Sequence, residues 1–194
     1  MQAERPRTIC LATALTRMTS ATPNPAAQLL SLRIPANGGT PNNDHPAIVA
    51  RGALRLSTGD PAGSIRRSFE ANGWTGTWTW QVFRYHHFHP DAFEVLGVAA
   101  GSAVLVIGGE AGRRLEVEAG DVLLLPPGWG HCMLSSSPDF AICGAYPPGQ
   151  ENYTVRRSSE GYDEGVTAEI AAVPVPETDP VLGGKGALLA SILK

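Results

Sequence analysis

The sequence predicts a mainly β domain, and its density of turn residues is the first reason. Glycine contributes 22 and proline 16 of the 194 residues, which is about one residue in five where about one in eight is usual. Between the turns lie short runs that are apolar throughout, as at 122–125, or that alternate apolar with polar residues, as at 114–118. Short strands separated by turns are typical of a β-sandwich or a small barrel.

The predicted elements follow from these patterns in chain order. A short strand is expected at the apolar run near Leu29, before a turn-rich stretch that ends at Pro46. One helix is expected between Asp60 and Asn72, because Asp-Pro suits a helix start and Asn-Gly suits its end. Further strands are expected at 77–83, 103–107, 114–118, 122–125 and 140–143, followed by an extended segment at 173–179 and a short helix at 187–193.

Composition and charge exclude several classes of function. The formal net charge is −3, whereas a nucleic-acid-binding domain would carry a basic stripe. No apolar run approaches the ~20 residues that a membrane-spanning helix needs. The three cysteines, Cys10, Cys132 and Cys143, are widely spaced and form no C-x-x-C pair, which favours a reducing compartment. We therefore expect a cytoplasmic protein with neither nucleic-acid nor membrane partners.

The first 25 residues are expected to form a disordered tail ahead of a single domain at 26–194. They contain Arg5, Arg7 and Arg17 and several serines and threonines, as an organellar transit segment at 1–17 would. Glu4 and the shortness of the apolar run argue against both a transit and a secretory signal. Met18 is an alternative start of the chain, which would make residues 1–17 an upstream extension.

Three histidines and one glutamate have the spacing of a metal site. His87-x-His89 on a strand places both imidazoles on one face, because side chains alternate along a strand. Glu94 can return to that face after the next turn, and His131 follows a Pro-Gly turn that aims it inward. Three neutral imidazoles and a carboxylate suit a divalent transition metal. The competing interpretation is a polar cluster that has lost its metal.

The two segments resemble the two motifs of the cupin superfamily. In the first, His87-Phe88-His89 is followed after four residues by Glu94 and after six more by Gly101. In the second, five residues separate Gly120 from Pro126, and Gly128 and His131 follow at fixed intervals. The resemblance implies a double-stranded β-helix, or jelly-roll barrel, with its core at about 74–146. It also implies that the four metal ligands are His87, His89, Glu94 and His131.

Two positions depart from the superfamily pattern without removing a ligand. Gln81 stands where a glycine usually precedes the first motif, and Ser135 stands where an asparagine often closes the second. Longer phrases resemble a narrower group, the uncharacterised small single-domain cupins of bacteria and fungi. They are IPANGGTPNN at 34–43, FEANGW at 69–74, YHHFHPDAFEVLG at 85–97, GAYPPGQ at 144–150 and PETDPVLG at 176–183. Phe93 replaces a histidine that is common in that group, whose substrates are not settled.

Other residues are candidates for the substrate pocket. Strand parity with His87 places Gln81, Phe83 and Tyr85 inside the barrel, where core packing is favoured for Phe83 and pocket roles are open for the other two. Tyr85 is the one candidate for a catalytic side chain. Trp129 could gate the barrel mouth or lie at a dimer contact, and Met133 is expected in the pocket wall. By the same parity, His86 and Cys132 face away from the metal.

The leading functional hypothesis is a metal-dependent enzyme that acts on a small organic molecule. Open coordination positions could bind substrate oxygens or dioxygen, so dioxygenase chemistry with Fe(II) is favoured, with Mn(II), Ni(II) or Zn(II) as other metals. Isomerisation or decarboxylation is the runner-up, and a non-catalytic metal- or ligand-binding protein is the alternative. A homodimer is expected from the resemblance and from the aromatic surface that Trp74, Trp78 and Trp80 offer.

Overall fold

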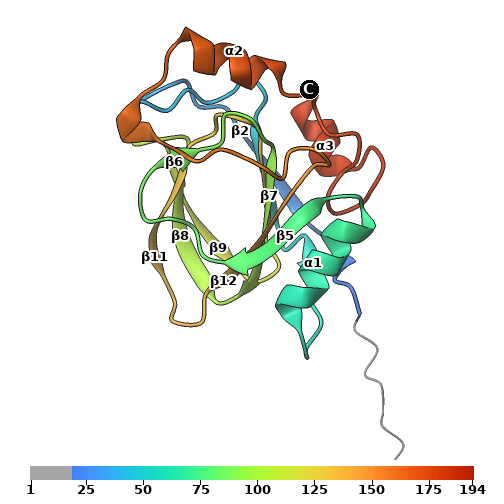
Figure 1. The fold of residues 1–194 in the computed structure, drawn as a ribbon. Helices are drawn as coiled ribbons and strands as arrows, with labels where there is room; N and C mark the ends of the chain where they lie inside the picture. The colour runs from blue at the N-terminus through green and yellow to red at the C-terminus, as the bar shows by residue number, and fades with distance from the viewer. Residues whose placement is uncertain (1–18) are drawn as a thin grey trace, which may run out of the picture.

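The computed structural model describes residues 19–194, which form a barrel of two facing antiparallel sheets with helices outside it (Figure 1). The six-stranded sheet has the order β2 (Gln28–Leu32), β3 (Ala47–Arg51), β10 (Val122–Leu125), β7 (Glu94–Ala100), β12 (Ala141–Tyr146) and β5 (Thr75–Trp80). The five-stranded sheet has the order β13 (Arg156–Arg157), β6 (His87–Phe88), β11 (His131–Ser136), β8 (Ser102–Ile107) and β9 (Arg113–Glu118). The predicted mainly β barrel is confirmed.

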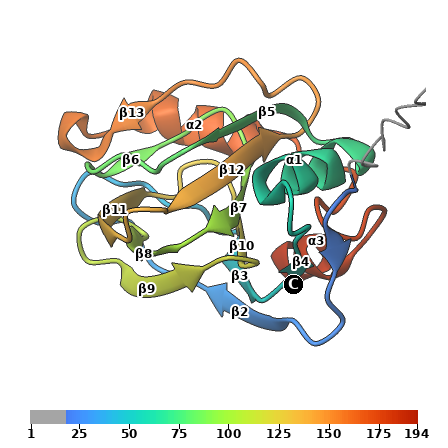
Figure 2. The same ribbon diagram turned by 90° about the horizontal axis from the view of Figure 1, so that it is seen from below.

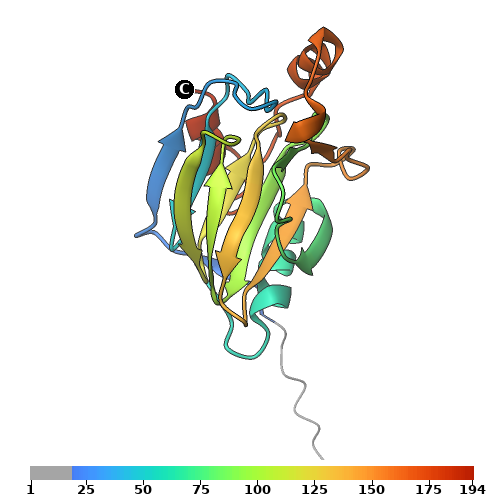
Figure 3. The ribbon, with the colours of Figure 1, turned by 90° about the vertical axis from the view of Figure 1, so that its left-hand side faces the viewer.

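The remaining elements lie outside the barrel. β1 (Thr22–Pro23) pairs with β4 (Leu54–Arg55) in a small separate sheet. The helices are α1 (Pro61–Ala71), the 3-10 turn η1 (Ser158–Glu160), α2 (Glu164–Ala172) and α3 (Ala187–Ile192). Helix α1 packs on β5, β7 and β12, and α3 packs on β3, so both cover the six-stranded sheet (Figure 2). Helix α2 stands at one end of the barrel, as the side view shows (Figure 3).

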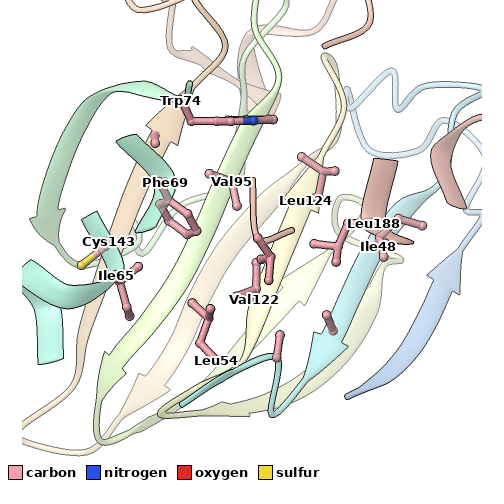
Figure 4. Packing of buried hydrophobic residues seen from close by; sticks show 14 of the residues in the cluster. Ile48, Leu54, Ile65, Phe69, Trp74, Val95, Val122, Leu124, Cys143 and Leu188 are labelled. Carbon is pink, nitrogen blue, oxygen red and sulfur yellow. The ribbon is translucent and has the colours of Figure 1, made fainter. Parts of the chain in front are cut away.

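The core consists of two layers, one on each face of the six-stranded sheet. Along β10, Leu123 and Leu125 belong to the apolar cluster inside the barrel. Val122 and Leu124 belong to the cluster on the opposite face of the sheet, under the helices (Figure 4). Because both faces are covered, this strand is apolar throughout instead of alternating. Gly97 in β7 lets α1 approach closely, since a Cβ atom there would lie 2.9 Å from Ile65 and 3.0 Å from Phe69.

The predicted helix between Asp60 and Asn72 is confirmed, and its sequence signals work as expected. Asp60 accepts a hydrogen bond from the backbone N–H of Gly63 at 2.9 Å, which caps the helix start. Ile65 and Phe69, one helical turn apart, are both fully buried against the sheet. The terminal helix and the strands at 102–107, 113–118 and 122–125 also lie where the sequence places them, within one or two residues.

Several expectations need correction. The strand predicted at 77–83 ends at Trp80, and residues 81–86 form an irregular segment. Trp74 is fully buried and donates from its indole N–H to Thr178 O at 2.9 Å, so it offers no surface for a dimer. The part of the predicted tail at 19–25 is ordered, because Ala21 is buried and β1 pairs with β4. Residues 1–18, including Cys10, lie outside the described residues.

A membrane-spanning helix needs a run of about 20 apolar residues. Within 19–194, no helix combines the length and the apolar character that spanning a bilayer requires.

Candidate metal centre

The four predicted ligands converge inside the barrel from three strands. His87 and His131 are the first residues of β6 and β11 and stand opposite each other in the register of those strands. His89 follows β6, and Glu94 begins β7 on the facing sheet. All four side chains are buried, and the three imidazoles each offer a nitrogen within 4.8 Å of the others. Oε2 of Glu94 lies 3.3 Å from Nε2 of His131 and 3.6 Å from Nε2 of His89.

The backbone fixes the tautomer of each histidine. Nδ1 of His87, His89 and His131 lies 3.2, 2.8 and 3.1 Å from the carbonyl oxygens of Tyr85, Thr154 and Trp129, respectively. A carbonyl oxygen can only accept a hydrogen bond, so each Nδ1 carries the hydrogen. The lone pair of each neutral ring is therefore on Nε2. Metal-ligating histidines are usually held in this way.

Glu94 is the fourth predicted ligand, and one of its carboxylate oxygens has no hydrogen-bond partner among the described residues. Its Oε1 accepts a hydrogen bond from the Tyr146 hydroxyl at 2.8 Å, and that hydroxyl accepts one from the Trp78 indole at 2.9 Å. Its Oε2 is buried and has no hydrogen-bond partner within residues 19–194. A buried carboxylate oxygen that faces imidazole nitrogens and lacks a donor is what a bound cation would satisfy. The residues present therefore fit a divalent metal.

The electrostatics of the cluster also favour positive charge at its centre. Burial, together with repulsion from His131 and His89, lowers the pKa of His87 to about 2, so this ring stays neutral. Burial acts against the charged forms of His89 and Glu94, but their mutual attraction outweighs it: the pKa of His89 is raised and the pKa of Glu94 is held well below its usual range. Glu94 therefore remains ionised and attracts a cation.

A cavity of about 220 Å³ lies beside the four ligands. Its wall comes mainly from β5, the segment that follows β5, and the strands β12 and β7, which lie beside β5, in that order, in the same sheet. Besides the ligands, the lining residues are Trp78, Trp80, Gln81, Val82, Phe83, Leu96, Tyr146 and Tyr153. The site is thus an open coordination site next to space for a small molecule, and the side chains do not fill it.

Of the other residues predicted to line the pocket, some line the cavity and others do not. Gln81 lines the cavity as expected, and so does Phe83. Tyr85 does not line it: its ring stacks on Phe83 at 4.8 Å between ring centroids and lies under the Arg157 guanidinium. The parity argument fails for Tyr85 because residues 81–86 are not a regular strand.

Two further predictions for the pocket are corrected. Trp129 is 1% exposed and donates from its indole N–H to His45 O at 2.8 Å, so it neither gates the mouth nor offers a surface contact. Met133 shares the inward face with His131 but packs in the apolar barrel core, away from the cavity. His86 stays outside the cluster, and its Nε2 lies 3.4 Å from Cys132 Sγ.

Sequence reasoning missed the residues that complete the cavity, above all Tyr146 and Tyr153. Their rings stack at 4.2 Å between centroids, and Tyr153 also lies edge-on to His89 at 4.6 Å. Burial and the nearby Glu94 carboxylate raise the pKa of Tyr146 well above its usual range, so its hydroxyl stays a donor. The one signal was the phrase GAYPPGQ, which contains Tyr146 and was used only to recognise a resemblance.

Comparisons with known proteins agree with this site. The profile of a family described as Cupin matches residues 83–165, a range that contains all four predicted ligands. Among curated proteins, the uncharacterised protein YjlB of Bacillus subtilis is 36% identical over 156 residues, which make up 80% of this chain and 91% of that protein.

Solved structures are similar at lower identity. A conserved, uncharacterised protein with a double-stranded β-helix domain from Klebsiella pneumoniae is 15% identical, with a TM-score of 0.34, over 69% of this chain and 87% of that one. A salicylate 1,2-dioxygenase from Pseudaminobacter salicylatoxidans is 14% identical, with a TM-score of 0.33, over 71% of this chain and 32% of that one. The chain therefore spans about a third of the dioxygenase, and less than a quarter of several other matching chains. At such TM-scores neither structure bears on the activity of this chain.

Proposed function

This chain belongs to the cupin family, and we propose that it is a metal-dependent enzyme that oxidises a small organic molecule with dioxygen, using Fe(II). One observation carries the proposal. Three histidines present Nε2 lone pairs and Glu94 presents an unpartnered oxygen at the edge of a cavity that side chains leave open. An iron(II) ion held by these four residues would supply Lewis acidity toward a substrate oxygen and redox chemistry with dioxygen.

The side chains around the cavity support oxidation over reactions that need a separate proton carrier. The Tyr146 hydroxyl already donates to Glu94 and accepts from Trp78, so its hydrogen bonds position a ligand. Gln81 offers an amide that can orient a substrate but cannot act as a base at neutral pH. Among the described lining residues, only Tyr153 remains as an ionisable group that is neither a ligand nor bonded to one. Isomerisation or decarboxylation, which relies on such groups, is therefore the second choice.

Metal content tests the site itself. Protein purified without added metal is expected to hold about one divalent transition metal per chain by elemental analysis. His87→Ala and His131→Ala should lose it, since each removes one of four ligands. His86→Ala is the matched control, because this neighbouring imidazole lies outside the cluster and should leave the metal content unchanged. Full metal content in both ligand variants would show that the proposed site is wrong.

Oxygen uptake tests the reaction. Metal-free protein reloaded with Fe(II) is expected to consume dioxygen when supplied with a suitable small phenol or enol, whereas protein reloaded with Zn(II) should not. Conversion of the substrate without oxygen uptake would favour an isomerase or a decarboxylase. A protein that holds its metal and binds ligands but turns over nothing would instead be a non-catalytic binding protein.

A further inference from the structure

Within residues 19–194, the wall of the cavity carries no charged side chain other than those of the predicted metal ligands. Among the described residues that line it, Glu94 is the only acidic one, and no arginine or lysine is present. The polar groups of the wall are the amide of Gln81, the two tyrosine hydroxyls and the indole N–H groups. Arg157 does not contribute, because its guanidinium lies 4.3 Å over the ring of Tyr85, which is not part of the wall.

The lack of cationic side chains in the wall limits the negative charge that a ligand in the cavity can carry. A divalent metal and the ionised Glu94 together leave one positive charge, which one anionic group of a ligand would neutralise. A second anionic group, such as a carboxylate elsewhere on the molecule, would lose its water and meet no cation in return. Leaving a charge unpaired in a low-dielectric site is strongly unfavourable.

The shape of the cavity restricts the ligand further. Five aromatic rings line it, those of Trp78, Trp80, Phe83, Tyr146 and Tyr153, which is a surface that favours flat molecules. Its volume of about 220 Å³ exceeds the roughly 150 Å³ of an apolar cavity that admits a benzene molecule. A ligand of one ring with small substituents therefore fits within this volume.

We propose that the substrate is a flat, uncharged molecule of about one ring, whose only ionisable groups are phenol or enol hydroxyls, and which carries no carboxylate or phosphate. This inference rests on the proposed metal site. The oxygen of that hydroxyl would face the four ligands, and the aromatic rings would contact the remainder of the molecule. Gln81, at the exposed end of the wall, is then a position where a cationic side chain would change this preference.

The test compares two probes that differ by one charge. 4-Methylcatechol and 3,4-dihydroxybenzoate present the same pair of hydroxyls on the same ring, but only the second adds a carboxylate. Zinc-loaded protein is used because zinc undergoes no redox reaction, and binding is measured by calorimetry. We expect 4-methylcatechol to bind on the order of tenfold more tightly or better, since the wall offers the carboxylate no partner. Equal affinity, or tighter binding of the benzoate, overturns the proposal, as does zinc-loaded protein that binds neither probe.

A pair of variants shows whether the wall is the cause. Gln81→Arg places a cation at the exposed end of the cavity and is expected to bring the affinity for 3,4-dihydroxybenzoate to within about threefold of that for 4-methylcatechol. Gln81→Met, of similar length and without charge, should keep the wild-type preference. A preference that is unchanged in both variants contradicts the assignment of the wall. Protein that binds 4-methylcatechol selectively but consumes no oxygen with iron would refute the proposed reaction and leave the inferred substrate class standing.

Discussion

Removing the hydroxyl of Tyr146 should weaken metal binding while leaving the fold in place. In Tyr146→Phe the ring remains, so its stacking on Tyr153 at 4.2 Å between centroids is kept. The hydrogen bond to Oε1 of Glu94 is lost, and so is the acceptor of the Trp78 indole. Glu94 is only 3% exposed, so water cannot readily replace the lost donor.

The magnitude follows from the kind of hydrogen bond. A hydrogen bond to a charged group contributes about 1.5–3 kcal/mol, and about 1.4 kcal/mol corresponds to a tenfold change in an equilibrium constant. We therefore expect zinc affinity to fall by roughly 10- to 100-fold, the range seen when residues that orient a metal ligand are replaced. The loss acts through the freedom that the Glu94 carboxylate gains before a metal binds.

The assay is competition for zinc against a chelator of known affinity. Tyr85→Phe is the matched control, because its ring is 5.7 Å from that of His87, between centroids, but Tyr85 does not line the cavity. This control should retain wild-type affinity, and thermal unfolding should confirm that both variants are folded. Unchanged zinc affinity in a folded Tyr146→Phe would refute the reasoning that Glu94 depends on this hydroxyl for its orientation.

Three further predictions concern packing, pH and assembly. Gly97→Ala should lower the free energy of unfolding by about 1–3 kcal/mol, and with it the thermal midpoint, because a Cβ atom there would lie 2.9 Å from an atom of α1. Gly59→Ala is the control, because a Cβ atom at Gly59 meets nothing within 4 Å. Equal midpoints in the two variants would count against close packing at β7. Zinc affinity should fall as the pH drops below the raised pKa of His89, because a protonated imidazole has no lone pair to offer the metal. The expected slope is about tenfold per pH unit. A zinc affinity that stays constant from about pH 8 to about pH 5 would contradict this prediction. Sedimentation should give a dimer of the 20.4 kDa chain, because β5 is the last strand of the six-stranded sheet among the described residues and its Trp80 is 61% exposed. A monomer at all concentrations would contradict that expectation.

The convergence of the four predicted ligands could be predicted because their spacing is local and their geometry is simple. His87 and His89 sit two residues apart in an extended segment, and the turns around Gly101 and Gly128 have positive φ angles of 62° and 82°, which glycine adopts without strain. Helix α1 was predictable for a similar reason, since its cap, its buried face and its stop lie within a dozen residues. In each case a short stretch of sequence contains the whole signal.

The rest of the site depends on contacts between distant parts of the chain. Tyr146 and Glu94 are 52 residues apart, and neither neighbourhood indicates that the other is near. Tyr85 was misplaced because alternation was assumed beyond Trp80, where β5 ends. Helix α2 was not predicted, although Asp163 caps it by accepting from Val166 N at 3.0 Å; only Val166 and Ile170 of its residues are buried, so its apolar pattern is short.

The three imidazole Nδ1 groups donate to peptide carbonyls, so the tautomer of each histidine does not depend on the side chain of the acceptor residue. Substitutions of the side chains of Tyr85, Thr154 and Trp129 leave the carbonyl acceptors present, so the histidines keep their tautomers wherever the backbone keeps its path. Relatives can therefore change all three residues and retain the same ligand set. Glu94 is the exception, because its orientation depends on a side chain. Variation in metal preference among such proteins should therefore follow the residue at position 146 more closely than the residues next to the histidines.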